Sequence, residues 1–182
     1  IAGNMITNLR QVMKDRGVEC RCIRCREARE KRLKVAKLKV ESYKASGGEE
    51  YFISYNSKDG KTLYGFCRLR LPKNNLSFRS SQSDERNPLK SETESKRSLA
   101  LLEMKKTALI RELHVYGELM PVGSKKKTQH SGLGRKLLSE AEKIAKKNGY
   151  KKMVVISGVG VRDYYRKFGY DLENSYMVKK LL

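Results

Sequence analysis

Apolar residues recur at helical spacing in two parts of the chain. An i, i+3, i+4 pattern predicts a short helix over residues 8–14, which Gly17 ends. A longer helix is predicted over residues 132–147, where one face collects the apolar side chains Leu133, Leu137, Leu138, Ala141, Ile144 and Ala145. Asn148 and Gly149 follow, as a left-handed C-terminal cap requires.

Alternating apolar and polar residues predict three strands between residues 34 and 72. An Asp-Gly pair favours a tight hairpin turn at residues 57–60, between the second and third strands, and Pro72 ends the third. Residues 73–98 are rich in Ser, Asn and charged side chains and contain few large apolar ones. Such a composition cannot offset the entropy of ordering, so it predicts a flexible insertion.

The second half of the chain predicts further strands and a short helix. Residues 107–117 and 151–157 are short apolar runs that suit buried strands. Residues 162–170 predict a short helix, and residues 171–180 a terminal strand or pair of strands. This order of elements predicts a mixed α/β (α+β) architecture.

Composition and charge narrow the class of protein. A chain of 182 residues that is 38% hydrophobic suits one main domain. The formal net charge of +21 favours a polyanionic partner, with nucleic acid first, an anionic membrane surface second, and charge that serves solubility alone as the remaining alternative. No export signal or membrane-length apolar run is visible, so we expect a soluble, cytoplasmic protein with no membrane partner.

A glycine-bearing segment, Gln129-His130-Ser131-Gly132-Leu133-Gly134, stands between a predicted strand and the long predicted helix. The start of a helix presents unpaired N–H groups and partial positive charge, and glycines let a phosphate approach the main chain. The Q-x-x-G-x-G spacing matches neither the dinucleotide fingerprint nor the P-loop. The segment therefore predicts a pyrophosphate site, and an ordinary helix-capping turn is the alternative.

This glycine pattern resembles the coenzyme A pyrophosphate loop of the GNAT acyltransferase superfamily. Longer segments are more specific: RELHVYG, TQHSGLG and VVISGVGVRDYYRKFGYDLENSYMVKK resemble the acetyltransferase domain of the Elongator catalytic-subunit family. ECRCIRCREAR and GFCRLRLP resemble the linker upstream of that domain. The resemblance covers nearly the whole chain except residues 73–98.

The resemblance implies a GNAT fold, a mixed and mostly antiparallel sheet flanked by helices, over residues 34–182. It implies that residues 1–33 are a basic linker with a cysteine cluster, at the C-terminal edge of a radical S-adenosylmethionine domain that this chain lacks. It also implies acetyl-CoA as cofactor, bound by Glu112, Leu113, His114, Val115, Gln129, Ser131, Gly132, Leu133, Gly134, Arg135 and Tyr165.

The family builds a carboxymethyl group on carbon 5 of the wobble uridine of tRNA, so the resemblance implies an acyltransferase domain that binds acetyl-CoA and tRNA. S-adenosylmethionine and an iron–sulfur cluster belong to the missing domain, whose C-x₃-C-x₂-C type spacing is not found here. Other Elongator-type subunits are further expected partners. Two alternatives stay open, a protein lysine N-acetyltransferase and a non-catalytic coenzyme- or RNA-binding module.

Cysteine spacing favours metal over disulfides. Cys20, Cys22 and Cys25 lie within six residues of one another, as thiolate ligands of a structural zinc often do. Cys67 is the candidate for the fourth ligand, although it lies in a predicted strand where it also suits the core. Free reduced thiols are the alternative to a metal site.

Two further groups of residues are assigned roles. Tyr164 and Tyr165 are the candidate catalytic residues, because a phenol near the thioester can protonate the departing thiolate, as the family resemblance also implies. Core aromatics are the alternative for such tyrosines. The candidate contacts to tRNA phosphates are the basic side chains Arg21, Arg24, Arg26, Lys125, Lys126 and Lys127.

Overall fold

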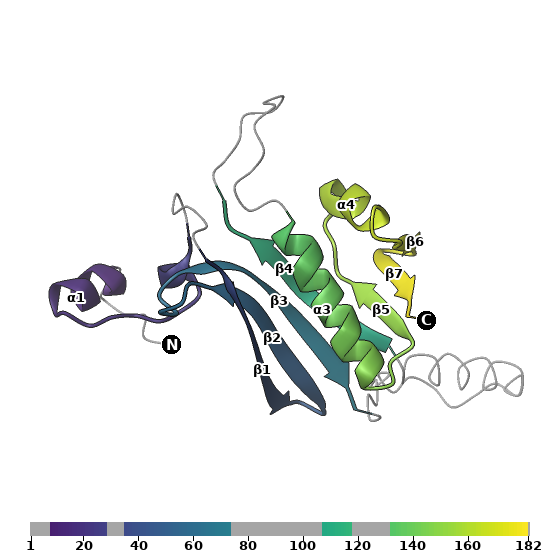
Figure 1. Cartoon of the computed structure of the whole chain (residues 1–182), viewed down its shortest axis with the longest axis horizontal. Coiled ribbons are helices and arrows are strands. Elements are labelled where there is room, and N and C mark those ends of the chain that lie inside the picture. Colours follow the sequence, from purple (N-terminus) through teal and green to yellow (C-terminus); the bar gives the residue numbers. More distant parts are fainter. Residues whose placement is uncertain (1–7, 29–34, 74–106, 118–131, 182) are drawn as a thin grey trace, which may run out of the picture.

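A computed structural model describes residues 8–28, 35–73, 107–117 and 132–181 (Figure 1). Seven strands form one sheet in the order β1-β2-β3-β4-β5-β7-β6. The strands are β1 (Lys37–Ala45), β2 (Gly48–Asn56), β3 (Leu63–Pro72), β4 (Thr107–Val115), β5 (Lys152–Val155), β6 (Asp171–Glu173) and β7 (Tyr176–Lys180). The helices are α1 (Leu9–Asp15), α3 (Leu133–Lys147) and α4 (Arg162–Arg166), with single 3₁₀ turns η1 (Arg24–Arg26) and η2 (Val159–Val161).

Strand directions confirm the expected mixed, mostly antiparallel sheet. Within it β4 and β5 are parallel, and each other neighbouring pair is antiparallel. The β2–β3 hairpin turns where the Asp-Gly pair predicts, because Gly60 adopts a φ of 71° and donates its N–H to the Ser57 carbonyl. The third strand ends at Pro72, also as predicted.

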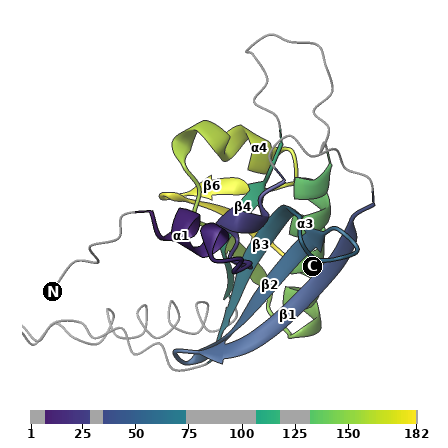
Figure 2. The same cartoon turned by 90° about the vertical axis from the view of Figure 1, so that its left-hand side faces the viewer.

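The main core lies between the sheet and α3, which packs across β2, β3 and β4. Alternate strand residues such as Ile53 and Leu69 point to this side, and Leu137 and Ala141 of α3 meet them. The predicted apolar face of the long helix is therefore the buried one. Figure 2 shows α1 on the side of the sheet opposite α3.

Two carboxylates, the buried Glu50 and the partly buried Glu142, have cationic partners, which offsets the cost of removing a charge from water. Glu142 of α3 accepts hydrogen bonds from the Tyr170 hydroxyl at 2.8 Å and the Lys179 ammonium at 2.9 Å, and so ties the helix to β7. On the other face of the sheet, Glu50 accepts from Arg70 at 2.7 Å and from Arg111 at 3.1 Å. These contacts join β2, β3 and β4.

The predicted linker is attached to the sheet through residues 26–28. The Ala28 N–H donates to the Leu63 carbonyl at 3.0 Å, and Arg26 donates to the Asn56 side chain at 3.2 Å. Most of the predicted insertion, residues 74–98, lies outside the described residues. Among the helices of the described residues, none is long and apolar enough to cross a membrane.

Candidate functional site

The parallel strands β4 and β5 separate before β4 ends. They pair over Thr107–Ile110 and Lys152–Val155, and the Ile156 N–H then donates to the Ile110 carbonyl at 3.2 Å. A bulge between Ile110 and Glu112 displaces Arg111 from the register with β3. Within the described strands, residues 111–115 therefore have no neighbour on the β5 side, and their main-chain groups are available to a ligand.

The start of α3 lies against the end of β4. Gly132 precedes the helix with a φ of 93°, a conformation that glycine adopts without strain. Gly134 is buried, and a Cβ placed there would overlap the Tyr164 hydroxyl and approach the Val115 side chain to 3.6 Å. The structure thus brings together Val115, Gly134 and Tyr164, which belong to three elements far apart in the sequence.

The tyrosine pair lies on α4, with perpendicular rings whose centroids are 5.3 Å apart. Tyr164 is half-buried beside Gly134, whereas Tyr165 is 6% exposed and packs on Tyr170 in the core. Burial raises the pKa of both phenols, that of Tyr165 to about 12, and the nearby Cys67 adds to the effect. Both hydroxyls are therefore protonated at neutral pH and suit proton donation rather than proton abstraction.

Side chains of β4 alternate between the two faces of the sheet. Leu113 and Val115 face the core under α3, whereas Glu112 reaches Arg68 at 3.8 Å and the His114 ring lies 6.1 Å from Phe66, both on the opposite face. Glu112 and His114 therefore present only their main-chain atoms, and not their side chains, at the open edge of β4.

The remaining predicted coenzyme contacts are divided between described and undescribed residues. Leu133 is buried against Ala28 and Tyr64, and Arg135 is exposed in the first turn of α3. Gln129, Ser131 and the predicted RNA contacts Lys125, Lys126 and Lys127 lie outside the described residues.

Glycine at position 65 was missed by the sequence reasoning. A Cβ at Gly65 would stand 2.9 Å from the His114 carbonyl oxygen and 3.2 Å from the Val115 Cα. This glycine lets β3 approach β4 closely where β4 forms the open edge. A glycine inside a predicted strand was the available signal, since it often marks a close backbone approach.

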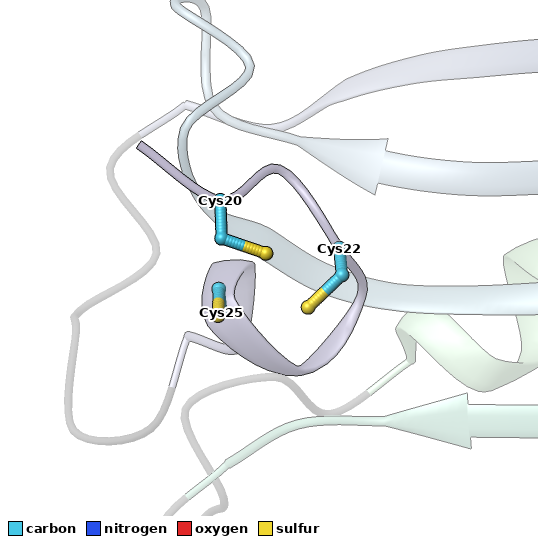
Figure 3. Close-up of side chains that lie close together, drawn as sticks. All are labelled: Cys20, Cys22 and Cys25. Atoms are coloured by element: carbon cyan, nitrogen blue, oxygen red, sulfur yellow. The ribbon is translucent and has the colours of Figure 1, made fainter. Parts of the chain in front are cut away.

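The cysteine trio forms a compact cluster on the opposite face of the sheet from α3. The sulfur atoms of Cys20, Cys22 and Cys25 all lie within 4.8 Å of one another, and Figure 3 shows the three side chains close together, with the Cys20 and Cys22 sulfurs turned into the space between them. The Cys25 backbone N–H donates to the Cys22 thiol, and this with the Cys20 contact lowers the pKa of Cys22 to about 7. Three converging sulfurs, one of them readily ionised, are a donor set that can hold a metal ion.

Cys67 is not brought to this cluster, so its assignment as the fourth ligand is corrected. Its side chain is 0% exposed and lies in the core between the sheet and α3, close to the tyrosine pair. Burial raises its pKa to about 12, which disfavours the thiolate that a metal requires. The alternative considered from the sequence, a small core residue in a strand, is the correct one.

Comparisons with known proteins agree with this geometry. The profile of the Acetyltransferase (GNAT) family matches residues 25–170. Elongator complex protein 3 of Danio rerio is 42% identical over 96% of this chain and 30% of its own length. The tRNA uridine(34) acetyltransferase of Dehalococcoides mccartyi is 40% identical over 95% of this chain and 35% of its own. The chain thus spans about a third of the length of these curated relatives.

A solved structure gives the same result. The Elp3 protein of the archaeon Methanocaldococcus infernus superimposes with a TM-score of 0.67 and is 37% identical. The match covers 95% of this chain and 38% of that structure. The resemblance to the Elongator catalytic-subunit family and the expected fold are both confirmed.

The raised phenol pKa values predict a loss of stability in alkali. Unfolded tyrosine ionises near pH 10, whereas Tyr165 keeps its proton up to about 12, so the folded state binds more protons in between. Stability should fall as the pH rises from 10 to 12. Tyr165→Phe should reduce this fall by roughly 2–3 kcal/mol, measured by urea unfolding at each pH. The exposed Tyr176→Phe is the control, and an equal effect in both variants would contradict the assignment.

The cysteine cluster predicts metal in the purified chain. Cys25→Ser should lower the metal content, measured by plasma mass spectrometry, from about one ion per chain to near zero. Cys67→Ala is the matched control, because it also removes one thiol but outside the cluster, and it should keep the metal. Equal loss in both variants would exclude the trio as the binding site.

Proposed function

The chain belongs to the acetyltransferase (GNAT) family, and we propose that it is the acetyl-CoA-binding domain of an enzyme that modifies the wobble uridine of tRNA. The convergence of Val115, Gly134 and Tyr164 at the open edge of β4 carries the proposal. Relatives that match nearly the whole chain bear the name tRNA uridine(34) acetyltransferase. A formal net charge of +21 supports a polyanionic substrate.

The residues at the site fit coenzyme A. The main-chain groups of residues 112–115 offer strand-like hydrogen bonds that suit the amides of the pantetheine arm. The first-turn N–H groups of α3, with Arg135 exposed beside them, suit the pyrophosphate. Gln129 and Ser131 remain predicted contacts to it. The coenzyme supplies an activated acetyl thioester at this edge of the sheet.

Tyr164 is the proposed general acid. If bound acetyl-CoA gave its acetyl group to an acceptor such as water, the coenzyme's sulfur would leave as a thiolate, and the half-buried Tyr164 hydroxyl beside Gly134, which is protonated at neutral pH, would be the group to donate a proton to it. Tyr165 is buried in the core and meets the Tyr164 ring edge-on, so its proposed role is to orient Tyr164. In this proposal, only Tyr164 of the predicted catalytic pair donates the proton, and Tyr165 supports it.

The cysteine trio is proposed to bind a structural zinc, the metal that thiolate clusters in folded linkers most often hold. Such an ion would fix Arg21, Arg24 and Arg26, which directly follow or precede the cysteines, for contact with tRNA phosphates. The relatives named Elongator complex protein 3 are components of a complex by their name, so other subunits of that kind are proposed partners. A cytoplasmic location stays a prediction.

Coenzyme binding should depend on Gly134. Gly134→Leu fills the space at the Tyr164 hydroxyl and Val115, and should weaken acetyl-CoA binding at least tenfold in isothermal titration. Ser139→Leu introduces the same side chain at an exposed position of α3 and should bind as the unaltered chain does. Matched circular dichroism spectra establish that both variants fold. Equal affinity in the two variants would place the coenzyme elsewhere.

Turnover distinguishes the proposed substrate from a lysine side chain. Acetyl-CoA cleavage should rise on addition of tRNA, and Tyr164→Phe should reduce that stimulated rate by roughly 10²–10⁴-fold, as loss of a general acid does. The excess of arginine and lysine over acidic residues disfavours a basic peptide substrate, because like charges repel. Acetylated basic peptides, without stimulation by tRNA, would instead support a protein lysine N-acetyltransferase.

A further inference from the structure

A basic hollow of about 570 Å³ lies beside the cysteine loop, which we define as residues 19–26. Its walls come from this loop, the start of β1 and the β2–β3 turn. Six basic side chains line it against the carboxylates of Glu19 and Asp59; they are Arg21, Arg26, Lys37, Lys39, Lys58 and Lys61. Its volume falls in the range of about 300–1,000 Å³ that is common for small-ligand sites.

Most of the positive charge in the basic hollow is not neutralised internally. Glu19 pairs with Lys61 at 3.4 Å, and Asp59 accepts from the Ser57 hydroxyl and the Lys61 N–H. Lys39 pairs with Glu41 of β1 at 2.9 Å. Among the described residues, the other four cations of the hollow have no carboxylate within ion-pair distance; they are Arg21, Arg26, Lys37 and Lys58.

Arg26 has a further unused donor. Its terminal nitrogen donates to the Asn56 side chain at 3.2 Å, but its Nε is buried and has no hydrogen-bond partner in the described part of the chain. A buried N–H without a partner is unfavourable, and an anion in the hollow would satisfy it. The basic hollow is therefore electrostatically prepared for a phosphate.

An aromatic hollow of about 720 Å³ lies on the other side of the cysteine loop. Arg10 and Arg24 line it together with Tyr43 and Phe52, and Glu41 is its carboxylate. Tyr43 is 48% exposed, and the Phe52 ring stacks on Phe66 at 5.2 Å. Aromatic rings beside arginines are a surface on which unpaired nucleic-acid bases stack.

Arg21 and Arg26 line both hollows, so the two are continuous around the cysteine loop. We propose that they form one binding site for an unpaired segment of RNA, with backbone phosphates in the basic hollow and a base against Tyr43 and Phe52. The choice of RNA as the polyanion rests on the proposed function. Lys37, Lys58 and Tyr43 thereby gain roles that neither the cysteine loop nor the coenzyme site assigns them.

Salt dependence of binding tests the basic hollow. Fluorescence anisotropy would follow a labelled single-stranded RNA on the full chain between 50 and 200 mM salt. Lys37→Gln with Lys58→Gln should weaken binding roughly tenfold at the lower salt and reduce the slope of log affinity against log salt by about 1 to 1.5. Lys146→Gln with Lys147→Gln removes the same charge from the exposed end of α3 and should change both values little.

A preference for single-stranded over duplex RNA tests the aromatic hollow. Tyr43→Ala should weaken binding of single-stranded RNA roughly five- to hundredfold, leave the salt slope unchanged, and have little effect on an RNA duplex of equal length, whose bases cannot stack on the protein. Circular dichroism establishes that each variant folds. Equal losses in both lysine pairs, or an unaltered single-strand affinity in Tyr43→Ala, would overturn the proposal.

Two further measurements separate this proposal from the proposed function. Polyglutamate that competes for the hollows as strongly as RNA would overturn the choice of RNA and identify an acidic protein segment instead. Acetyl-CoA titration of the same variants reports on the coenzyme site alone, which lies on β4 and α3. If acetyl-CoA binds normally and the RNA results fail, the hollows are wrongly assigned; if acetyl-CoA does not bind and the RNA results hold, the coenzyme assignment fails.

Discussion

The parallel pairing of β4 with β5 is the constraint on which the arrangement of the site depends. Parallel neighbours need a crossover connection, and α3 belongs to it. The crossover leaves from the end of β4, and β5 ends at the same edge of the sheet. The start of α3 and the start of α4 must therefore meet the end of β4. For this reason Gly134 and Tyr164 lie together although thirty residues separate them.

The separation of β4 from β5 then leaves one side of the end of β4 unpaired, next to the start of α3. A sheet that remained paired to the end of β4 would satisfy its own main-chain groups. Here the bulge at Arg111 and the end of the β5 pairing leave residues 111–115 with an open side, adjacent to the helix start. The open strand edge and the helix N–H groups thus lie next to each other, an arrangement that suits the proposed ligand, which carries both amides and a pyrophosphate.

The sheet also divides the chemistry of the protein between its two faces. The residues of the proposed coenzyme site lie at one end of the sheet and on the α3 side, whereas the cysteine loop and its arginines lie on the opposite side. Cys67 illustrates the division, because the two-residue alternation of β3 points it into the α3 core while its neighbours Phe66 and Arg68 face the other way. The four cysteines of the chain therefore lie in two different environments, one in the core and three in the cysteine loop.

Periodicity by itself determined most of the elements. The alternation over residues 34–72, the Asp-Gly turn and the apolar face of the long helix all correspond to observed structure, because each reflects local geometry and burial of one face. The sequence also revealed two local clusters, because residues close in sequence must lie close in space. They are the glycine pattern at Gly132 and Gly134 and the group of Cys20, Cys22 and Cys25.

Contacts between distant segments were decided by the tertiary structure alone. The placement of Tyr164 on Gly134 depends on the crossover, the exclusion of Cys67 depends on which face of β3 is buried, and the grouping of Tyr43 and Phe52 with the arginines depends on where the linker crosses the sheet. No periodic pattern in the sequence indicates these contacts, because each is set by how whole elements pack and not by the conformational preference of any residue within them.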